Sequence, residues 1–176
     1  MGESEKSEVF SIRINPELKK KLQKESGAKD TNLNSLINSI LIDHISCEIN
    51  YADLGVAMMF RSVFKDVFDA VDKEKIIKIS ETTGKAELIK LQNYVYGSLD
   101  IETLLIETER YLQKMNVKFN KFKEVQGTRY FVQHDLGKNW PYYLVHTVGP
   151  VLEEVGYRMT DKKFEEGLFS FTVEKS

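Results

Sequence analysis

Three histidines and a single cysteine are the side chains in this chain best suited to bind a metal ion. His44 and Cys47 stand three residues apart on a predicted helix, a spacing at which two side chains can hold one ion. His134 and His146 lie far downstream, and His44 also belongs to the apolar stripe of its helix. The pattern therefore favours a buried, hydrogen-bonded His44, and we expect no metal site.

His134 and Asp135 are the other pair that could do chemistry, at the end of a predicted strand and ahead of Gly137 and Asn139. Such a loop can hold polar groups over a pocket, or its residues can simply orient a turn. No serine or cysteine stands at a motif-like spacing to complete a catalytic set, and there is no glycine-rich phosphate loop. We expect a protein that is not an enzyme and has no cofactor, with catalysis by His134 and Asp135 as an alternative.

The composition is that of a globular, cytoplasmic protein. Of the 176 residues 41% are hydrophobic, which is enough for a packed core. The longest apolar run, residues 56–60, is far shorter than the roughly 20 residues that span a bilayer, and the opening MGESEKSE does not resemble a signal peptide. The net charge of -2 argues against bulk attraction to nucleic acid, so DNA binding would need a local basic patch.

Residues 9–14 alternate strictly between two sets of side chains, which predicts a short, half-buried strand. One face is apolar and the other is mixed: Phe10, Ile12 and Ile14 against Val9, Ser11 and Arg13. The next extended candidate begins near Gly55, so the strand has no partner in its own module. An isolated short strand is unstable in water, and a twofold dimer would pair it with its symmetry mate.

Two amphipathic helices are expected after this strand. Asn15-Pro16 is typical of a helix start and Gly27 of a helix end. A second helix begins at Thr31 or Asn32, and its apolar residues recur at helical spacing: Leu33, Leu36, Ile37, Ile40, Leu41, His44 and Ile45.

Together the strand and helices resemble the ribbon-helix-helix (MetJ/Arc/CopG-type) transcription regulators. The likeness covers residues 9–45 and rests on the alternating FSIRI strand, the NPEL helix start and the LNSLIN opening of the second helix. In that family the strands of two chains form an antiparallel ribbon that enters the DNA major groove. The resemblance implies a homodimer or higher homo-oligomer that binds double-stranded DNA and regulates transcription, as a repressor or as an activator.

The resemblance also assigns roles to single residues. Base contacts would come from Val9, Ser11 and Arg13, of which Arg13 can bind guanine through two hydrogen bonds. Phosphate contacts would come from the start of the second helix and from the first helix: Asn32, Asn34, Ser35, Lys19, Lys20 and Lys24. The dimer core would be Phe10, Ile12, Ile14, Leu36, Ile37 and Ile40.

Two features depart from the family pattern. Val9 stands at a reader position that is often polar or basic in the family, which would reduce hydrogen-bond readout there. The reader face has one positive charge per chain, so non-specific affinity would depend on the lysines of the first helix.

The nickel-responsive members of this class carry a closely spaced histidine pair in their sensor domain, and this chain has none.

The longer C-terminal part predicts a run of helices followed by a mostly antiparallel sheet, an α+β domain. Residues 55–60 slightly favour a buried strand. Helices are expected at residues 63–71, at 76–79, at 86–96 before Gly97, and after a cap at Asp100. A β-hairpin at 117–134, a helix at 140–155 that Gly149-Pro150 should kink or break, and strands at 157–160 and 168–173 complete the order.

Aromatic side chains are dense in this part: Tyr130, Phe131, Trp140, Tyr142, Tyr143, Tyr157, Phe169 and Phe171. They are compatible with a ligand cavity for a small-molecule effector, with an ordinary core, or with a surface on which dimers associate. We therefore expect a DNA-binding and dimerisation module at residues 1–50 and an oligomerisation or ligand-sensing domain at 51–176. The alternatives are an antitoxin-type protein whose C-terminal part binds a partner protein, and an edge strand with a helical hairpin that has no DNA role.

Overall fold

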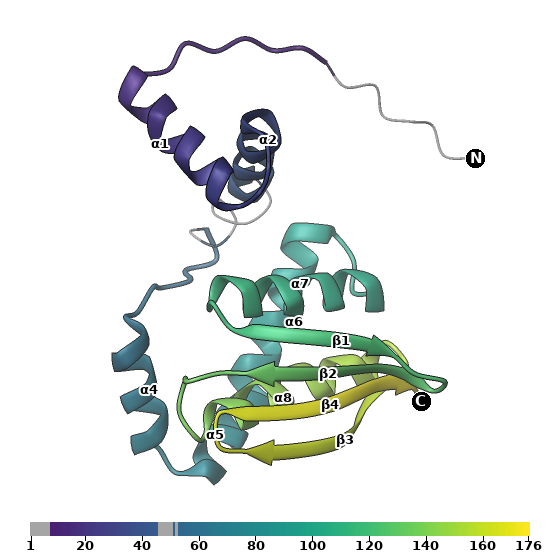
Figure 1. Ribbon diagram of the computed structural model, residues 1–176. Helices are drawn as coiled ribbons and strands as arrows, with labels where there is room; N and C mark the ends of the chain where they lie inside the picture. The colour runs from purple at the N-terminus through teal and green to yellow at the C-terminus, as the bar shows by residue number, and fades with distance from the viewer. Residues whose placement is uncertain (1–7, 46–50, 52) are drawn as a thin grey trace, which may run out of the picture. The chain divides into compact units, whose positions relative to one another are not determined.

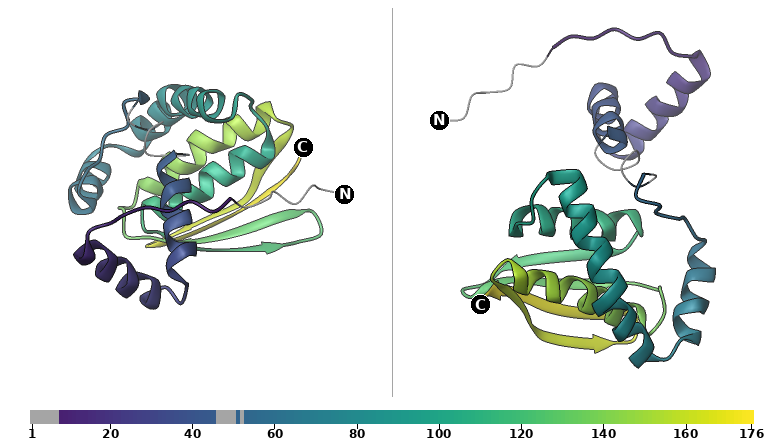
Figure 2. Two further views of the ribbon diagram at one scale, coloured as in Figure 1. Left: turned by 90° about the horizontal axis from the view of Figure 1, so that it is seen from above. Right: turned by 180° about the vertical axis from the view of Figure 1, so that it is seen from behind.

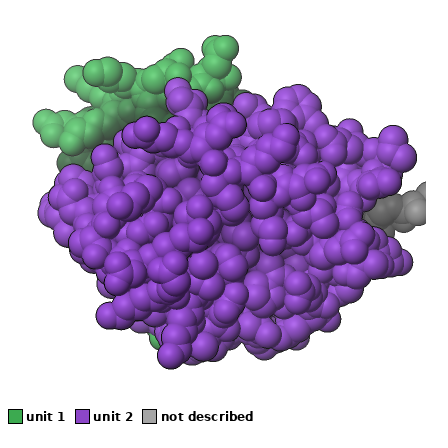
Figure 3. Space-filling model, turned by 90° about the horizontal axis from the view of Figure 1, so that it is seen from below, with its two compact units in different colours: residues 1–53 green, residues 54–176 purple. Residues whose placement is uncertain are grey.

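The computed structural model describes residues 8–45, 51 and 53–176, and the chain divides into two compact units (Figure 1). The N-terminal unit comprises residues 1–53 and the C-terminal unit residues 54–176, and Figure 3 colours them separately. Each unit has its own secondary structure. No helix in the described part of the chain is long and apolar enough to cross a membrane.

The N-terminal unit contains two helices, α1 (Pro16–Ala28) and α2 (Leu33–Asp43). Asn15 caps α1, because its Oδ1 accepts a hydrogen bond from the amide of Glu17 at 2.8 Å. Asn32 caps α2 in the same way, with the amide of Ser35 donating to Oδ1 at 2.9 Å. Both predicted helix starts are therefore confirmed.

The predicted strand at residues 9–14 is wrong for the single chain. Residues 8–15, which we call the arm, form neither helix nor strand. No other described residue of the N-terminal unit is in a strand, so the arm has no neighbour to take its backbone hydrogen bonds. A lone extended segment then remains irregular.

The C-terminal unit begins with helices. These are α4 (Arg61–Ala70), α5 (Lys73–Ile79), a π-helical turn η2 (Ser80–Gly84), α6 (Lys85–Tyr96) and α7 (Ile101–Lys114). Gly97 ends α6 in the left-handed region at φ 68°, and Asp100 Oδ1 caps α7 by accepting from the amide of Thr103 at 3.0 Å. The strand expected at residues 55–60 is wrong: residues 56–60 are irregular and exposed, since no strand lies beside them to pair with.

A four-stranded sheet follows, with order β1-β2-β4-β3 and every neighbouring pair antiparallel. The strands are β1 (Lys118–Lys123), β2 (Gly127–Gln133), β3 (Tyr157–Glu165) and β4 (Leu168–Lys175). Figures 1 and 2 show α8 (Trp140–Glu154) against one face of the sheet and α6 packed on α8, while the other face of the sheet, which we call the uncovered face, carries no helix. The predicted α+β class with an antiparallel sheet is confirmed.

Helix α8 connects β2 to β3 and corrects two details of the sequence reading. It is continuous through Gly149 and Pro150, so a break there is wrong, while the alternative of a kink stays a prediction; Val148 and Val151 on either side are buried in the core. Asn139 precedes the helix as predicted, but its side chain makes no cap bond. Its Nδ2 instead donates to the carbonyls of Phe68 and Val71, at 3.0 and 2.7 Å, which ties α8 to α4.

The core lies between α8 and the helix-facing side of the sheet. Strand alternation turns Tyr130 and Val132 of β2 inward, together with Phe169 and Phe171 of β4. Trp140 of α8 is fully buried against Phe169, with ring centroids 5.7 Å apart. Several of the C-terminal aromatics are thus ordinary core residues, which was one of the three uses left open.

At Gly127 the backbone of β4 leaves no room for a side chain on β2. A Cβ built on Gly127 would collide with the backbone oxygen of Val173, whereas a Cβ on Gly149 in α8 would meet nothing within 4 Å. We predict that Gly127→Ala lowers the free energy of unfolding by about 1–3 kcal/mol, because β2 must shift away from β4. Gly149→Ala should leave it unchanged or raise it by up to about 1 kcal/mol. Urea unfolding of both variants checks this, and equal effects would contradict it.

Candidate functional site

The arm holds all three expected base-contacting residues, and in the single chain each of them is exposed: Val9, Ser11 and Arg13. The apolar face of the arm is also largely exposed, at 78% for Phe10 and 49% for Ile12. Only Ile14 is half-buried. Neither face of the arm is therefore covered by its own chain.

The expected dimer-core residues of α2 divide into two groups. Leu36 is buried within its own chain, and Ile37 is half-buried. Ile40 and its neighbour Leu41 are exposed, at 42% and 45%. The two-helix unit thus leaves apolar surface uncovered at the end of α2. Burying a fully exposed side chain of this kind gains about 1.5–3 kcal/mol, and somewhat less than half of that remains to be gained at each of these residues.

The start of α2 offers backbone amides at the positive end of a helix. Asn32, Asn34 and Ser35 are exposed there, as a phosphate contact would require. However, the amide of Ser35 already donates to Asn32 Oδ1. The amides of Leu33 and Asn34 are therefore the first-turn donors better placed to hold a phosphate, because the cap leaves them available.

Local charge favours an anionic partner. Residues 9–45 contain six lysines and arginines against four acidic residues, although the whole chain is net negative. Lys19, Lys20 and Lys24 on α1 are exposed, while Lys29 is paired with Glu25 at 2.7 Å. The basic excess is small, which limits the non-specific affinity that it can supply.

The residues considered for metal binding do not form a described site. His44 is exposed, so the expectation of a buried histidine is wrong, and Cys47 lies outside the described residues. His146 contacts Glu81, with 2.8 Å between Nδ1 and Oε1. Among the residues that the structure describes, no group of three or more histidine, cysteine or acidic side chains could hold a metal ion.

His134 and Asp135 line a pocket of about 700 Å³ together with residues of α4, α8 and the β3–β4 turn. Asp135 hydrogen-bonds and ion-pairs with Arg61 of α4. Arg61 also donates to the carbonyls of Met115 and Asn116, at 2.7 and 3.2 Å. The pair therefore fastens α4 to the end of α7 and to the β2–α8 loop, a structural role that motif reasoning does not find.

The ring of His134 is largely buried between Trp140 and Phe169, with ring centroids at 4.9 and 5.7 Å. Its Nδ1 accepts a hydrogen bond from the amide of Leu136 at 3.3 Å, and its Nε2 is buried without a partner in the described chain. Burial lowers the pKa of His134 below 6.5, Asp135 opposes this, and Arg61 adds to it. Conversely, the hydrogen bond from Arg61 is the main cause that lowers the pKa of Asp135.

Arg129 is a further candidate that the motif search misses. It lies on the uncovered face of the sheet, because alternation along β2 turns Arg129 and Phe131 away from the core residues Tyr130 and Val132. The available signal in the sequence is this alternation, which places a charged and an aromatic side chain on one face.

Comparisons of the chain with known protein families, with curated proteins and with solved structures find no match. The functional argument therefore depends on the chain's own residues.

Burial of His134 predicts a pH-dependent stability. A histidine whose pKa is lower in the folded than in the unfolded protein disfavours folding once the unfolded chain takes up the proton, so stability falls as the pH drops through about 6.5 toward the folded pKa. We predict that the free energy of unfolding falls more between about pH 7.5 and about pH 5.5 in the wild type than in His134→Asn. The asparagine keeps an acceptor for Leu136 but has no titrating ring. Urea unfolding at both pH values checks this, and equal slopes would contradict it.

Proposed function

We propose that this protein is a cytoplasmic, dimeric, sequence-specific DNA-binding transcription regulator of the ribbon-helix-helix type. The observation that carries the proposal is the exposure of Phe10, Ile12 and Ile40 beside two well-capped helices. A unit of this kind has local order but buries too little apolar surface by itself. A second copy, related by a twofold axis, would supply the missing strand and the missing core.

In the proposed dimer the two arms pair as an antiparallel ribbon. Alternation then turns Phe10 and Ile12 toward the four helices and leaves Val9, Ser11 and Arg13 on the opposite side for the base edges of the major groove. The lysines of α1 and the first-turn amides of α2 would hold the flanking phosphates. Both faces of the exposed arm thereby receive a role.

The C-terminal unit is proposed to regulate this module through oligomerisation or ligand sensing. It has a continuous buried core of its own, built from α8 and the sheet. That supports a regulator over an antitoxin, because antitoxin tails commonly lack a core until they bind their partner protein.

Dimerisation is tested at the end of α2. Ile40→Glu places a charge in the proposed helix-helix core and should yield a monomer, with the dimer dissociation constant raised by at least about tenfold. Asn38→Glu adds the same charge on the polar side of α2 and should leave the dimer intact. Analytical ultracentrifugation of the full chain distinguishes them. A wild type that is monomeric, or an Ile40→Glu variant that stays dimeric, would sink the proposal.

DNA reading is tested at Arg13. Sites are first selected from random duplex DNA with the wild type at a stated salt concentration. On the selected site Arg13→Ala should weaken binding by roughly 1–3 kcal/mol and relax the preference at one base pair.

The matched control for Arg13 is Lys24→Ala on α1. It should weaken binding to every duplex about equally. The slope of the logarithm of the binding constant against the logarithm of the salt concentration should become shallower by about one unit, which corresponds to one phosphate contact. Fluorescence anisotropy over a salt series measures both quantities. Equal behaviour of the two variants would argue against base reading by the arm.

A further inference from the structure

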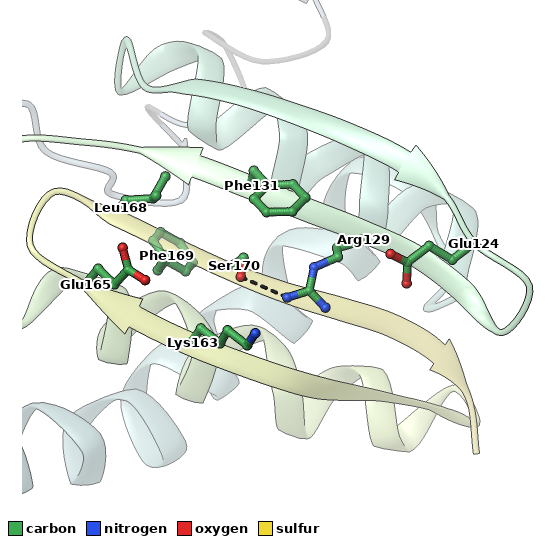
Figure 4. A pocket seen from close by; sticks show the side chains of 8 residues that line it. All are labelled: Glu124, Arg129, Phe131, Lys163, Glu165, Leu168, Phe169 and Ser170. Carbon is green, nitrogen blue, oxygen red and sulfur yellow. Dashed lines mark hydrogen bonds between the residues drawn. The ribbon is translucent and has the colours of Figure 1, made fainter.

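The uncovered face of the C-terminal sheet holds a concave patch of about 500 Å³, which we call the sheet-face patch (Figure 4). The strand register explains which residues share it, because Ser170 of β4 lies opposite both Phe131 of β2 and Lys163 of β3. Arg129, two residues before Phe131, points to the same side. The volume falls in the range of small-molecule sites.

Arg129 is the centre of the patch and is fixed in position. Its side chain is only 14% exposed. Its Nη2 donates to Ser170 Oγ at 3.1 Å and its Nη1 to Thr172 Oγ1 at 3.3 Å. The guanidinium carbon lies 5.3 Å from the centre of the Phe131 ring. Hydroxyls and an aromatic ring therefore orient this cation without neutralising it.

The nearest carboxylate compensates this charge only partly. Asp161 Oδ2 lies 3.8 Å from Arg129 Nη1, and the Asp161 side chain is 70% exposed. A mostly buried cation whose counter-ion lies near the outer limit of an ion pair and is largely solvated is costly to the fold. An anion bound beside Arg129 would remove that cost, and a guanidinium is well shaped to bind a carboxylate through two hydrogen bonds.

A second cation faces the same patch. The register of β3 against β4 shifts between Thr160 and Lys163, where Asp161 takes a left-handed conformation at φ 47°. This bulge sets Lys163 opposite Ser170. Lys163 is exposed and makes no ion pair with any residue that the structure describes. Its ammonium is therefore available to the same anion as Arg129.

The other end of the patch is apolar. Phe131 and Leu168 are each 38% exposed there, and Figure 4 shows them on the same side of Arg129. Glu165 lies at this end as well and lines the patch. The patch thus combines two cations with an apolar wall, and it has a carboxylate at each end, Glu124 beyond Arg129 and Glu165 beside Leu168.

We propose that the sheet-face patch binds a small organic acid in which a carboxylate is attached to a short apolar group. The carboxylate contacts Arg129 and Lys163, and the apolar group lies against Phe131 and Leu168. A ligand that also carries an ammonium group, as an amino acid does, pairs in addition with Glu165. This inference concerns the C-terminal unit alone and does not depend on DNA binding by the arm.

Calorimetric titration of the full chain with matched probes tests the ligand class. The probes are leucine and phenylalanine, the corresponding acids 4-methylpentanoate and 3-phenylpropanoate, and the neutral amides of those acids. Carboxylates should bind at least about tenfold more tightly than the amides. Tighter binding of the amino acids supports a zwitterionic ligand, and equal or tighter binding of the simple acids supports a plain carboxylate. The proposal is overturned if no probe binds at millimolar concentration, or if the amides bind as well as the acids.

Variants on the same sheet face test the residues. Arg129→Gln should weaken carboxylate binding by about ten- to a hundredfold. Arg158→Gln is the matched control, since Arg158 shares the uncovered face but is paired with Glu174 at 2.8 Å outside the patch. Equal affinity in Arg129→Gln and wild type, or equal losses in both variants, would overturn the proposal.

Two further substitutions keep this test decisive if Arg129→Gln does not fold. Lys163→Gln changes an exposed position and should lower carboxylate affinity severalfold. Phe131→Ala should weaken binding of the phenyl and isobutyl probes, whereas Val125→Ala, at a fully exposed apolar position outside the patch, should not. Thermal melting of each variant verifies that the fold is intact.

Discussion

The backbone of a short extended segment needs a neighbouring strand, and this requirement governs the N-terminal unit. The arm at residues 8–15 has no such neighbour among the residues that the structure describes, and its apolar residues Phe10 and Ile12 are exposed. The helices α1 and α2 are locally well formed because Asn15 and Asn32 cap them. The proposed twofold ribbon would supply the neighbouring strand that the arm needs.

The C-terminal unit satisfies its own requirements by contrast. Each strand of its sheet pairs with a neighbour in the same unit, its inner face is covered by helices, and Arg61 and Asn139 tie α4 to the loop and helix that follow β2. Its uncovered face is the exception, since Arg129 is held there by two hydroxyls and has only the largely exposed carboxylate of Asp161, 3.8 Å away, as an ion-pair partner. The N-terminal unit thus leaves apolar side chains and the backbone of the arm exposed, whereas the C-terminal unit leaves one cation only partly compensated.

Features set by local interactions could be predicted from the sequence, and features that depend on distant partners could not. The caps at Asn32 and Asp100 are confirmed because each involves residues within one helical turn. The strands expected at residues 9–14 and 55–60 are wrong because alternation or apolarity does not supply a neighbouring strand. Arg129 could not be identified as a site residue from the sequence, because the hydroxyls that orient its side chain belong to another strand, about forty residues away.

The most direct test of the central claim is amide hydrogen exchange in the arm as a function of protein concentration. If two arms form an antiparallel ribbon, alternate amides between residues 9 and 14 are hydrogen-bonded across the twofold axis. They should exchange slowly where the dimer predominates and lose this protection on dilution, while the amides of the C-terminal sheet stay protected throughout. Exchange of the arm at the rate of an unstructured peptide, in a sample shown to be dimeric, would contradict the account.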